Sequence, residues 1–423
     1  MKTKLIQKIR GTYDILPTEQ KYWRFIKEKA ISVLEKAGFG RIDFPIFEDA
    51  FLFSRSVGEE TDIVEKEMYI FRDRGDDILA LRPEGTASVV RAYIENGMQS
   101  WTQPVKLYYE GPMFRYERPQ AGRFRQFYQI GFEAIGDIDP TIDVEVISLT
   151  YDLCLSLGLK NLIIQINSIG CSRCRPRFTQ DLINFVSDKK GAFCADCLKR
   201  MEKNPLRILD CKNPSCQKAL SESPSILDSL CRECHDHFMK VLEYLDDLEI
   251  PYNLNTHLVR GLDYYTKTVF EIWTEKEGAQ NAVAGGGRYD DLVELLGGKK
   301  TPAAGCAFGV ERLVAELKNQ QVEIPEEKPV KVFVAALGEE AKHEALKIIN
   351  KCRRAGIGAV GDLSKETLKS QLKIADKLKV PITLILGQKE LLDKTIILRQ
   401  MEERVQEAIK ESKIISELKK RLK

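Results

Sequence analysis

The sequence contains no uninterrupted apolar run approaching the roughly 18 residues of a membrane-spanning helix. Its first ten residues include three lysines and one arginine, and they lack the apolar core of a secretory signal peptide. Internal repeats at a fixed period and low-complexity tracts are also missing. These absences predict a cytoplasmic globular protein without membrane association.

The composition is that of a multidomain protein. With 423 residues, 43% of them apolar and 30% charged, the chain is long enough for two or three cored domains and too hydrophobic to be disordered. The net charge of +2 is unevenly distributed, because residues 330–423 carry 21 Lys and Arg against 13 Asp and Glu. This basic region suits a polyanion such as nucleic acid, although a lysine-rich solvated surface would carry the same charge.

The pattern of apolar residues indicates the fold class. Before residue 318, helical spacing predicts helices over 18–37, 86–96 and 141–157. The predicted strands are 42–47, 68–71, 78–81, 105–114, 126–135, 162–166, 268–273 and 303–308. Because strands and helices do not alternate regularly, we expect an α+β fold with a largely antiparallel sheet and flanking helices.

The C-terminal region has a different pattern. Predicted strands at 332–337, 357–360 and 382–386 alternate with predicted helices at 339–355, at 365–378 and in a long final helix. This alternation is typical of a small α/β domain. The polar stretch 318–329 is predicted to be the linker that precedes it.

Eight of the eleven cysteines lie between residues 171 and 234. They form four close pairs, namely Cys171 with Cys174, Cys194 with Cys197, Cys211 with Cys216, and Cys231 with Cys234. Disulfides are not expected in a reducing cytoplasm, whereas thiolates at this spacing can bind tetrahedral zinc, so eight of them suit one or two structural sites. The alternative is a small helical module whose thiols are free and mostly buried.

Polar residues gather around one predicted hairpin, formed by the two strands within residues 105–135. Alternation along its second strand places Gln129 and Glu133 on the face opposite Ile130. A carboxylate and an amide thus share one wall near Arg115, where a core strand would be apolar. A solvent-facing strand would show the same alternation, but the arginines at both ends of the loop favour a binding face.

Three further motifs carry arginine or glycine at places where a ligand can approach. Arg260 precedes a glycine in a predicted turn, which leaves room beside a fixed guanidinium. Three consecutive glycines in 284–292 permit a backbone close to a ligand, but they lack the spacing of a dinucleotide or phosphate-loop fingerprint. Arg312 lies in the first turn of a helix and can meet a phosphate there, or form an ion pair within the helix.

Together these motifs resemble the histidine-tRNA ligases among the class II aminoacyl-tRNA synthetases, over nearly the whole chain. Residues 10–17 resemble the family's start, 39–53 its first class motif, the hairpin its second motif, 258–265 and 284–291 its histidine signatures, and 304–313 its third motif. Departures at Tyr128 and Cys306 fall on no residue to which the resemblance assigns a role.

The resemblance implies an antiparallel class II sheet of six to seven strands with flanking helices, a small Cys-rich insertion and an α/β anticodon-binding domain. It places the catalytic domain at 1–168 and 238–317, the insertion at 169–237, the linker at 318–329 and the anticodon-binding domain at 330–423. It also implies a homodimer, with Pro45 at the interface.

The implied activity is ATP-dependent activation of L-histidine, with Mg²⁺ bound to the ATP, and transfer of histidine to tRNA(His). By the resemblance, the catalytic residues are Arg115, Arg260 and Arg312. Arg115 would hold the α-phosphate and the substrate carboxylate, Arg260 the α-phosphate opposite the attacking oxygen, and Arg312 the γ-phosphate. Arg123 would add a further contact to ATP. Arginines at these places suit a reaction that needs fixed positive charge rather than a protein nucleophile.

The same resemblance assigns residues to histidine and to tRNA. Glu84 and Thr86 would bind the α-amino group together with Gln129. The imidazole would be held by Glu133 and by Tyr264 or Tyr265, and Arg260 also belongs to this histidine site. In the loop between the hairpin strands, Arg118 and Gln120 would contact the acceptor end of the tRNA.

Two other functions fit parts of the sequence. A non-catalytic, histidine-binding paralogue that regulates a biosynthetic enzyme is the nearest alternative. It is disfavoured because the three arginines are retained and because the basic C-terminal domain, which such relatives typically lack, is present. A nucleic-acid-binding zinc ribbon would account for the cysteines alone.

Overall fold

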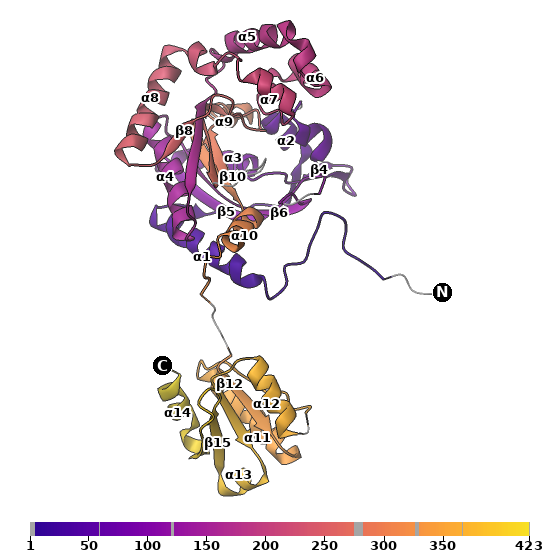
Figure 1. Ribbon diagram of the computed structural model, residues 1–423, viewed down its shortest axis with the longest axis vertical. Helices are drawn as coiled ribbons and strands as arrows, with labels where there is room; N and C mark the ends of the chain where they lie inside the picture. The colour runs from indigo at the N-terminus through magenta and orange to yellow at the C-terminus, as the bar shows by residue number, and fades with distance from the viewer. Residues whose placement is uncertain are drawn as a thin grey trace. The chain divides into compact units, whose positions relative to one another are not determined.

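The computed structural model describes residues 5–58, 60–119, 122–274, 282–325, 330–365 and 367–422. It divides into two compact units, Met1–Ile324 and Pro325–Lys423 (Figure 1). Among the described residues, no helix is both long enough and apolar enough to cross a membrane.

The first unit is built on a mixed sheet of eight strands, in the order β1-β5-β6-β11-β10-β9-β7-β8. The six central strands pair antiparallel with one another: β5 (Val105–Phe114), β6 (Gln126–Ile135), β11 (Ala303–Gly309), β10 (Ala282–Arg288), β9 (Thr266–Thr274) and β7 (Leu162–Ser168). The predicted boundaries of the hairpin β5–β6 are confirmed to the residue.

The expected sheet of six to seven antiparallel strands is wrong at both edges. The strands β1 (Gly40–Arg41) and β8 (Tyr252–Leu254) extend the sheet to eight, and both run parallel to their neighbours. Two or three residues are too few to show a period-two pattern, so the sequence carried no signal for them. The α+β class itself is confirmed.

One face of the sheet is covered by helices α1 (Gln20–Lys36), α4 (Pro140–Ser156), α8 (Arg232–Asp247) and α10 (Val310–Asn319). The apolar stripe of α1, formed by Ile26, Ala30 and Leu34, packs with Ile130 and Phe132 of β6 in one core. The spacing of four residues in α1 puts these side chains on one helix face. The alternation predicted for β6 is therefore confirmed on its apolar side.

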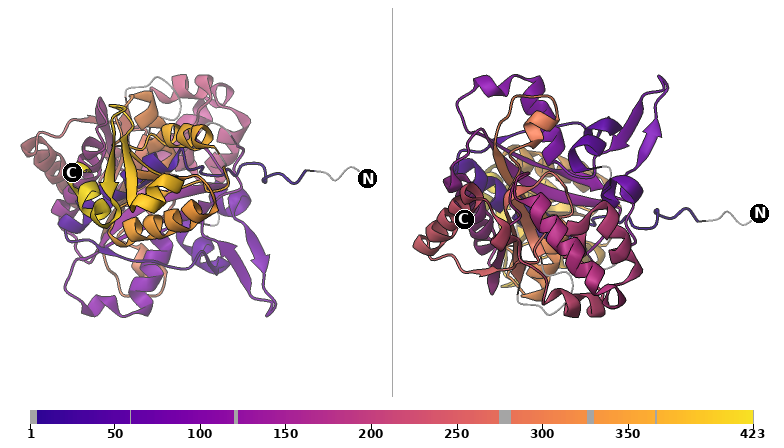
Figure 2. Two further views of the ribbon diagram at one scale, coloured as in Figure 1. Left: turned by 90° about the horizontal axis from the view of Figure 1, so that it is seen from below. Right: turned by 90° about the horizontal axis from the view of Figure 1, so that it is seen from above.

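The opposite face of the sheet carries α3 (Thr86–Glu95), α9 (Leu292–Leu295) and the cysteine-rich insertion. The insertion lies between β7 and α8 and contains α5 (Arg175–Asp188), α6 (Ala195–Lys203) and α7 (Pro214–Leu220). Figure 1 shows these helices together at one end of the unit, and they face the viewer in the right panel of Figure 2.

A smaller sheet in the order β2-β4-β3 lies beside α2 (Ala50–Val57). Its strands are β2 (Phe47–Asp49), β3 (Ile70–Arg72) and β4 (Ile78–Leu81). The ribbon of β3 and β4 projects from the body of the unit in both panels of Figure 2.

The second unit has a five-stranded sheet in the order β13-β12-β14-β15-β16. Its elements are β12 (Val332–Ala336), α11 (Glu339–Arg354), β13 (Ala359–Val360), α12 (Leu368–Lys377), β14 (Ile382–Leu386), α13 (Gln388–Asp393), β15 (Thr395–Gln400), β16 (Gln406–Lys410) and α14 (Ile414–Arg421). The predicted long final helix is wrong, because an antiparallel hairpin, β15–β16, interrupts it. Strand β15, which begins with the β-branched run Thr395-Ile-Ile397, buries Ile396 and Leu398 in the core, and this burial overrides the helical propensity of the charged flanks.

Candidate active site

A pocket of about 670 Å³ opens on the sheet face that carries α3 and the insertion. The predicted residues that line it are Glu84, Thr86, Arg115, Arg123, Gln129, Arg260, Tyr264, Tyr265 and Arg312. They come from α3 and the loop before it, the hairpin, the 258–265 segment and the start of α10. Four segments that lie far apart along the chain thus meet in one cavity.

Glu84 forms a fixed carboxylate at the start of α3. It accepts hydrogen bonds from the backbone N–H groups of Thr86 and Ala87, both at 2.8 Å, and from the Tyr264 hydroxyl at 3.3 Å. An acidic side chain is favourable there because the first N–H groups of a helix have no partner within the helix. Burial nevertheless raises the pKa of Glu84 above its usual value, while the N–H groups of Ala87 and Thr86 oppose that rise.

Glu133 lies behind the pocket wall rather than on it. Its two carboxylate oxygens accept hydrogen bonds from the Thr86 hydroxyl at 2.8 Å and the Tyr289 hydroxyl at 2.5 Å. The side chain is 1% exposed, and burial raises the pKa of Glu133 to about 8. The group is therefore largely protonated near neutral pH.

Two glycines let these polar groups approach the sheet. A Cβ at Gly305 would lie 1.6 Å from a carboxylate oxygen of Glu133, and one at Gly285 would lie 2.5 Å from a terminal nitrogen of Arg260. Neither position has space for a side chain. The glycine-rich motif at 284–292 is thus explained in part by the room that Arg260 needs.

Arg260 is held by a carboxylate that the sequence had not indicated. Its guanidinium forms an ion pair with Glu271 of β9 and lies 5.8 Å from the Tyr265 ring centre. The other oxygen of Glu271 accepts a hydrogen bond of 2.8 Å from the Trp273 indole. Burial disfavours the charged guanidinium, but Glu271 together with Tyr265, Cys306 and Tyr264 outweighs it, so the pKa of Arg260 lies above its usual value. Glu271 could have been found from its position, since it is an acidic residue within a buried strand.

The other two arginines are anchored by backbone carbonyls. The Nε of Arg115 donates to the carbonyl of Pro83 at 2.9 Å, and a terminal nitrogen of Arg312 donates to the carbonyl of Ala282 at 2.8 Å. Burial and the neighbouring charge of Arg123 lower the pKa of Arg312. An anchored guanidinium has further N–H groups that can point at an anion.

Gln129 and Tyr109 present buried polar atoms to the pocket. The Oε1 of Gln129 and the hydroxyl of Tyr109 have no hydrogen-bond partner among the described residues. A buried polar atom without a partner costs free energy unless something binds it, so both atoms suit contact with a ligand. Tyr109 was not predicted as a site residue.

The second half of the 284–291 motif is structural. Arg288 is fully buried and donates to Asp143 of α4 at 2.9 Å and to Asp290 at 3.2 Å. Although burial opposes ionisation, Arg288 and His237 hold the pKa of Asp143 below its usual value. These residues bind α4 to β10 and do not line the pocket.

The loop between β5 and β6 contributes unequally. Arg123 lines the pocket and lies 3.3 Å from Glu117, whereas Arg118 is exposed and is not part of the lining. Gln120 lies outside the described residues. Cys306, one of the two departures noted above, lines the pocket, and burial raises the pKa of its thiol to about 12.

The insertion also reaches the pocket, which the sequence did not indicate. Its contributions are Arg207, Asp210, Lys212 and Gln217. They flank the cysteines of the insertion, which form two separate groups. Within each group the four sulfur atoms lie within 4.8 Å of one another.

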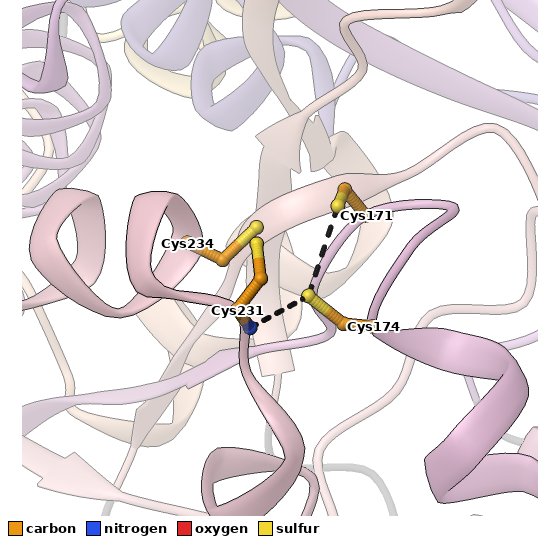
Figure 3. Close-up of side chains that lie close together, drawn as sticks. All are labelled: Cys171, Cys174, Cys231 and Cys234. Carbon is orange, nitrogen blue, oxygen red and sulfur yellow. Dashed lines mark hydrogen bonds between the residues drawn. The ribbon is translucent and has the colours of Figure 1, made fainter.

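We name these groups the base cluster (Cys171, Cys174, Cys231 and Cys234) and the outer cluster (Cys194, Cys197, Cys211 and Cys216). In the base cluster two cysteines come from the loop before α5 and two from the start of α8, and their thiols converge (Figure 3).

Comparison with known proteins identifies the family. The model of the histidyl-tRNA synthetase family matches residues 11–313, and that of an anticodon-binding domain matches residues 331–421. The chain belongs to the histidyl-tRNA synthetases. The synthetase is 47% identical to the histidine–tRNA ligase of Dehalococcoides mccartyi strain BAV1, over 99% of this chain and all of that protein. It is 49% identical to that of Desulfitobacterium hafniense strain DCB-2, over 94% of this chain and 93% of the relative.

A solved structure agrees with this assignment. The synthetase matches the crystal structure of apo S. aureus histidyl-tRNA synthetase with a TM-score of 0.82 and 38% identity, covering 97% of this chain and 99% of that one. The predicted family is thereby confirmed, and the synthetase is an enzyme that activates histidine and charges tRNA with it. The regulatory paralogue is not favoured, because full-length relatives are ligases and the anticodon-binding domain is present.

Proposed function

We propose that the pocket converts L-histidine and ATP to histidyl-adenylate and pyrophosphate, and that the histidine then passes to the 3′ end of tRNA(His) with release of AMP. The observation that carries this proposal is the convergence of Arg115, Arg260 and Arg312 with Glu84 and Gln129 in one cavity. Cations and amino-acid-binding groups are thus available to a single reaction.

The three arginines are the catalytic groups of the proposal. The histidine carboxylate attacks the α-phosphorus of ATP in line with the leaving pyrophosphate, and negative charge grows on the equatorial oxygens. Arg115 binds the α-phosphate and the carboxylate, Arg260 binds the α-phosphate from the opposite side, and Arg312 and Arg123 bind the distal phosphates. Anchoring by Pro83, Glu271 and Ala282 supports these roles, since a cation held in place needs no reorganisation during the reaction.

Mg²⁺ belongs to the ATP substrate and neutralises part of its phosphate charge. Carboxylate oxygens are the ligands that Mg²⁺ prefers. Glu117 and Glu311 line the pocket beside Arg123 and Arg312, so the chain offers suitable groups on the wall that we assign to the phosphates.

Histidine is recognised by the buried polar wall. Glu84, Thr86 and Gln129 bind the α-amino group, and the unpartnered oxygen of Gln129 supports this role. Tyr264 and Tyr265 bind the imidazole, while Glu133, which lies behind the pocket wall, holds the hydroxyl groups of Thr86 and Tyr289 in place. An amino acid without ring nitrogens would leave these groups unpaired, a penalty that can supply about 10⁴-fold selection.

The tRNA contacts both units in this proposal. Exposed Arg118, together with Gln120, meets the acceptor end, and the basic second unit reads the anticodon. Its surplus of Lys and Arg supports phosphate contact. Both roles place the protein in the cytoplasm, where tRNA is charged.

A homodimer is proposed from the apolar surface near Pro45. The exposed side chains there are Ile46 (45% exposed), Phe47 (54%), Phe51 (61%), Ile70 (54%), Phe71 (41%) and Ile78 (47%). A group of large apolar side chains on a soluble unit is typical of an interface. Sedimentation should give twice the chain mass, and Phe51→Asp should lower it to the monomer.

Charging of tRNA(His) tests the function. Purified protein with ATP, Mg²⁺ and labelled histidine should form histidyl-tRNA and release AMP, and it should not do so with another tRNA. Histidine binding without adenylate or charged tRNA would instead assign the chain to the regulatory paralogues. We also propose that the cysteines of the insertion hold structural zinc.

A further inference from the structure

The base and outer clusters have the dimensions of two mononuclear metal sites. A tetrahedral zinc with Zn–S bonds of about 2.3 Å has sulfur atoms about 3.8 Å apart. The observed Sγ–Sγ distances are 3.7 Å for Cys171 and Cys174, 3.9 Å for Cys194 and Cys211, and 3.9 Å for Cys197 and Cys216. A disulfide would need about 2.05 Å.

The backbone also orients the sulfur atoms. The N–H of Cys231 donates to the sulfur of Cys174 at 3.1 Å, and the N–H of Cys194 donates to that of Cys216 at 3.1 Å. The two clusters share this arrangement because Cys231 and Cys194 each precede the first turn of a helix, α8 and α6. Such bonds to ligand atoms are typical of metal sites.

The convergence of the thiols fits a bound cation. Cys174, Cys197, Cys211, Cys216 and Cys234 are buried, and in each cluster four sulfurs converge on one point. Four thiolates at this spacing repel one another unless a cation lies between them. Sulfur ligands in a tetrahedral arrangement select zinc or iron, and the short sulfur distances leave room for a single ion.

The base cluster joins the two ends of the insertion beside the histidine site. Arg175, which follows Cys174, donates to the backbone carbonyl of Tyr265. Lys267 donates its backbone N–H to the carbonyl of Gly170 at 2.8 Å and lies 3.6 Å from Glu233, which is placed between the two cysteines of α8. Both ends of the insertion, next to the cysteines of the base cluster, therefore contact the segment that carries Tyr264 and Tyr265.

The outer cluster positions the insertion's part of the pocket wall. Asp210 and Lys212 flank Cys211, and Gln217 follows Cys216, and all three line the pocket. Helix α6, which begins at the outer cluster, is held on the catalytic body by Lys203 and Glu65 at 2.7 Å and by Arg200 and Asp62 at 3.5 Å. Lys212 also lies with Glu271 and Trp273 around an adjoining cavity, so it adds a cation on the side of Arg260.

We propose that the base and outer clusters each bind one zinc ion, and that the outer ion positions Lys212 and Gln217 on the wall of the active site. The binding of zinc is independent of the catalytic proposal, whereas the positioning role rests on it. Each ion replaces the protons of its thiols, so the bound ligands are thiolates.

Metal content tests the two sites without reference to activity. Protein purified without chelators should contain two equivalents of zinc and no stoichiometric iron by mass spectrometry. A mercurial reagent that blocks the thiols of the folded wild type should release both ions. Less than half an equivalent of zinc, or an equivalent of iron, would overturn the assignment.

Single substitutions test the pairing. Cys211→Ser and Cys234→Ser should each lose one zinc, while Cys352→Ser, a buried thiol in the second unit, should keep both. If one substitution removes both ions from protein that is still folded by circular dichroism, the two sites are not separate and the pairing is wrong.

Kinetics test the positioning role. In histidine-dependent exchange of pyrophosphate into ATP, Cys211→Ser should raise the KM for ATP by about tenfold or more, with a smaller change in kcat. Lys212→Ala should also raise the KM for ATP, while both zinc ions remain bound. Loss of one zinc with unchanged kinetics would overturn the positioning role, and a wild type with two zinc ions and no exchange would overturn the proposed function instead.

Discussion

The two ends of the pocket are built differently. At the end that we propose binds histidine, Glu84, Thr86, Glu133, Tyr264 and Tyr289 are hydrogen-bonded to one another or to the start of α3. At the end that we propose binds the ATP phosphates (the phosphate end), Arg115, Arg260 and Arg312 are anchored to Pro83, Glu271 and Ala282 and come from separate segments.

This difference matches the two tasks of the enzyme. A buried wall of paired polar groups is rigid and penalises a substrate that cannot complete its bonds, so it suits selection. Guanidinium groups that are already anchored by the protein can stabilise the negative charge that develops during the reaction, so they suit catalysis. Changes at the three arginines should therefore lower kcat, and changes at the proposed histidine end should mainly raise the KM for histidine.

The largest effect is expected for Arg260→His. If Arg260 stabilises charge on the α-phosphate, kcat for pyrophosphate exchange should fall by at least about 10², with far less change in the KM for ATP. Arg72→His, at an exposed ion pair with Asp76, is the matched control and should leave both unchanged. A loss confined to KM would show that Arg260 only binds ATP.

Gly285→Ala tests whether the position of Arg260 at the phosphate end is important for kcat. The new Cβ would lie 2.5 Å from the guanidinium of Arg260 and must displace it, so kcat should fall by about tenfold although the arginine is retained. Gly191→Ala, where a Cβ meets nothing within 4 Å, should have wild-type kinetics. An unchanged kcat in Gly285→Ala would indicate that the position of Arg260 is not critical.

Tyr289→Phe tests the histidine end. It removes the hydrogen bond to Glu133 and should raise the KM for histidine by about tenfold, while kcat changes little. Tyr151→Phe, outside the pocket, is the control. If kcat falls as much as in Arg260→His, the two ends do not have separate tasks.

The last expected effect is thermodynamic and concerns the pH dependence of stability. The pKa of Glu133 rises from 4.5 to about 8 on burial, so the folded state retains a proton that the unfolded state releases. The free energy of unfolding of the wild type should therefore fall, relative to Glu133→Gln, as the pH rises between these values. Denaturant titrations of both proteins across this range give the difference, and parallel curves would show that Glu133 is ionised when folded.

The hairpin and its polar face were predictable because one long alternating pattern specifies both. Gln129 reaches the pocket and Ile130 the core, as their positions on β6 require. The three arginines were predicted from sequence motifs and not from the periodicity of apolar residues. Their convergence in one cavity required the strand order of the sheet, which no local pattern contains.

Other features depend on contacts between distant segments. The ion pair of Glu271 with Arg260 and the bond of Tyr289 to Glu133 join residues whose roles appear only when β9, β10 and β6 are in register. The pairing of the cysteines was likewise open, because spacing identifies close pairs but not which pairs meet. The hairpin that replaced the final helix was missed because its charged residues resemble an amphipathic pattern.

Amino-acid selection tests the account most directly. Pyrophosphate exchange into ATP should be measured with histidine and, separately, with phenylalanine and glutamine, at saturating ATP and Mg²⁺. We predict exchange with histidine and a kcat/KM lower by about 10⁴ for phenylalanine and glutamine, because the buried polar wall would be left unpaired. Comparable exchange with phenylalanine, or none with histidine from folded protein, would contradict it.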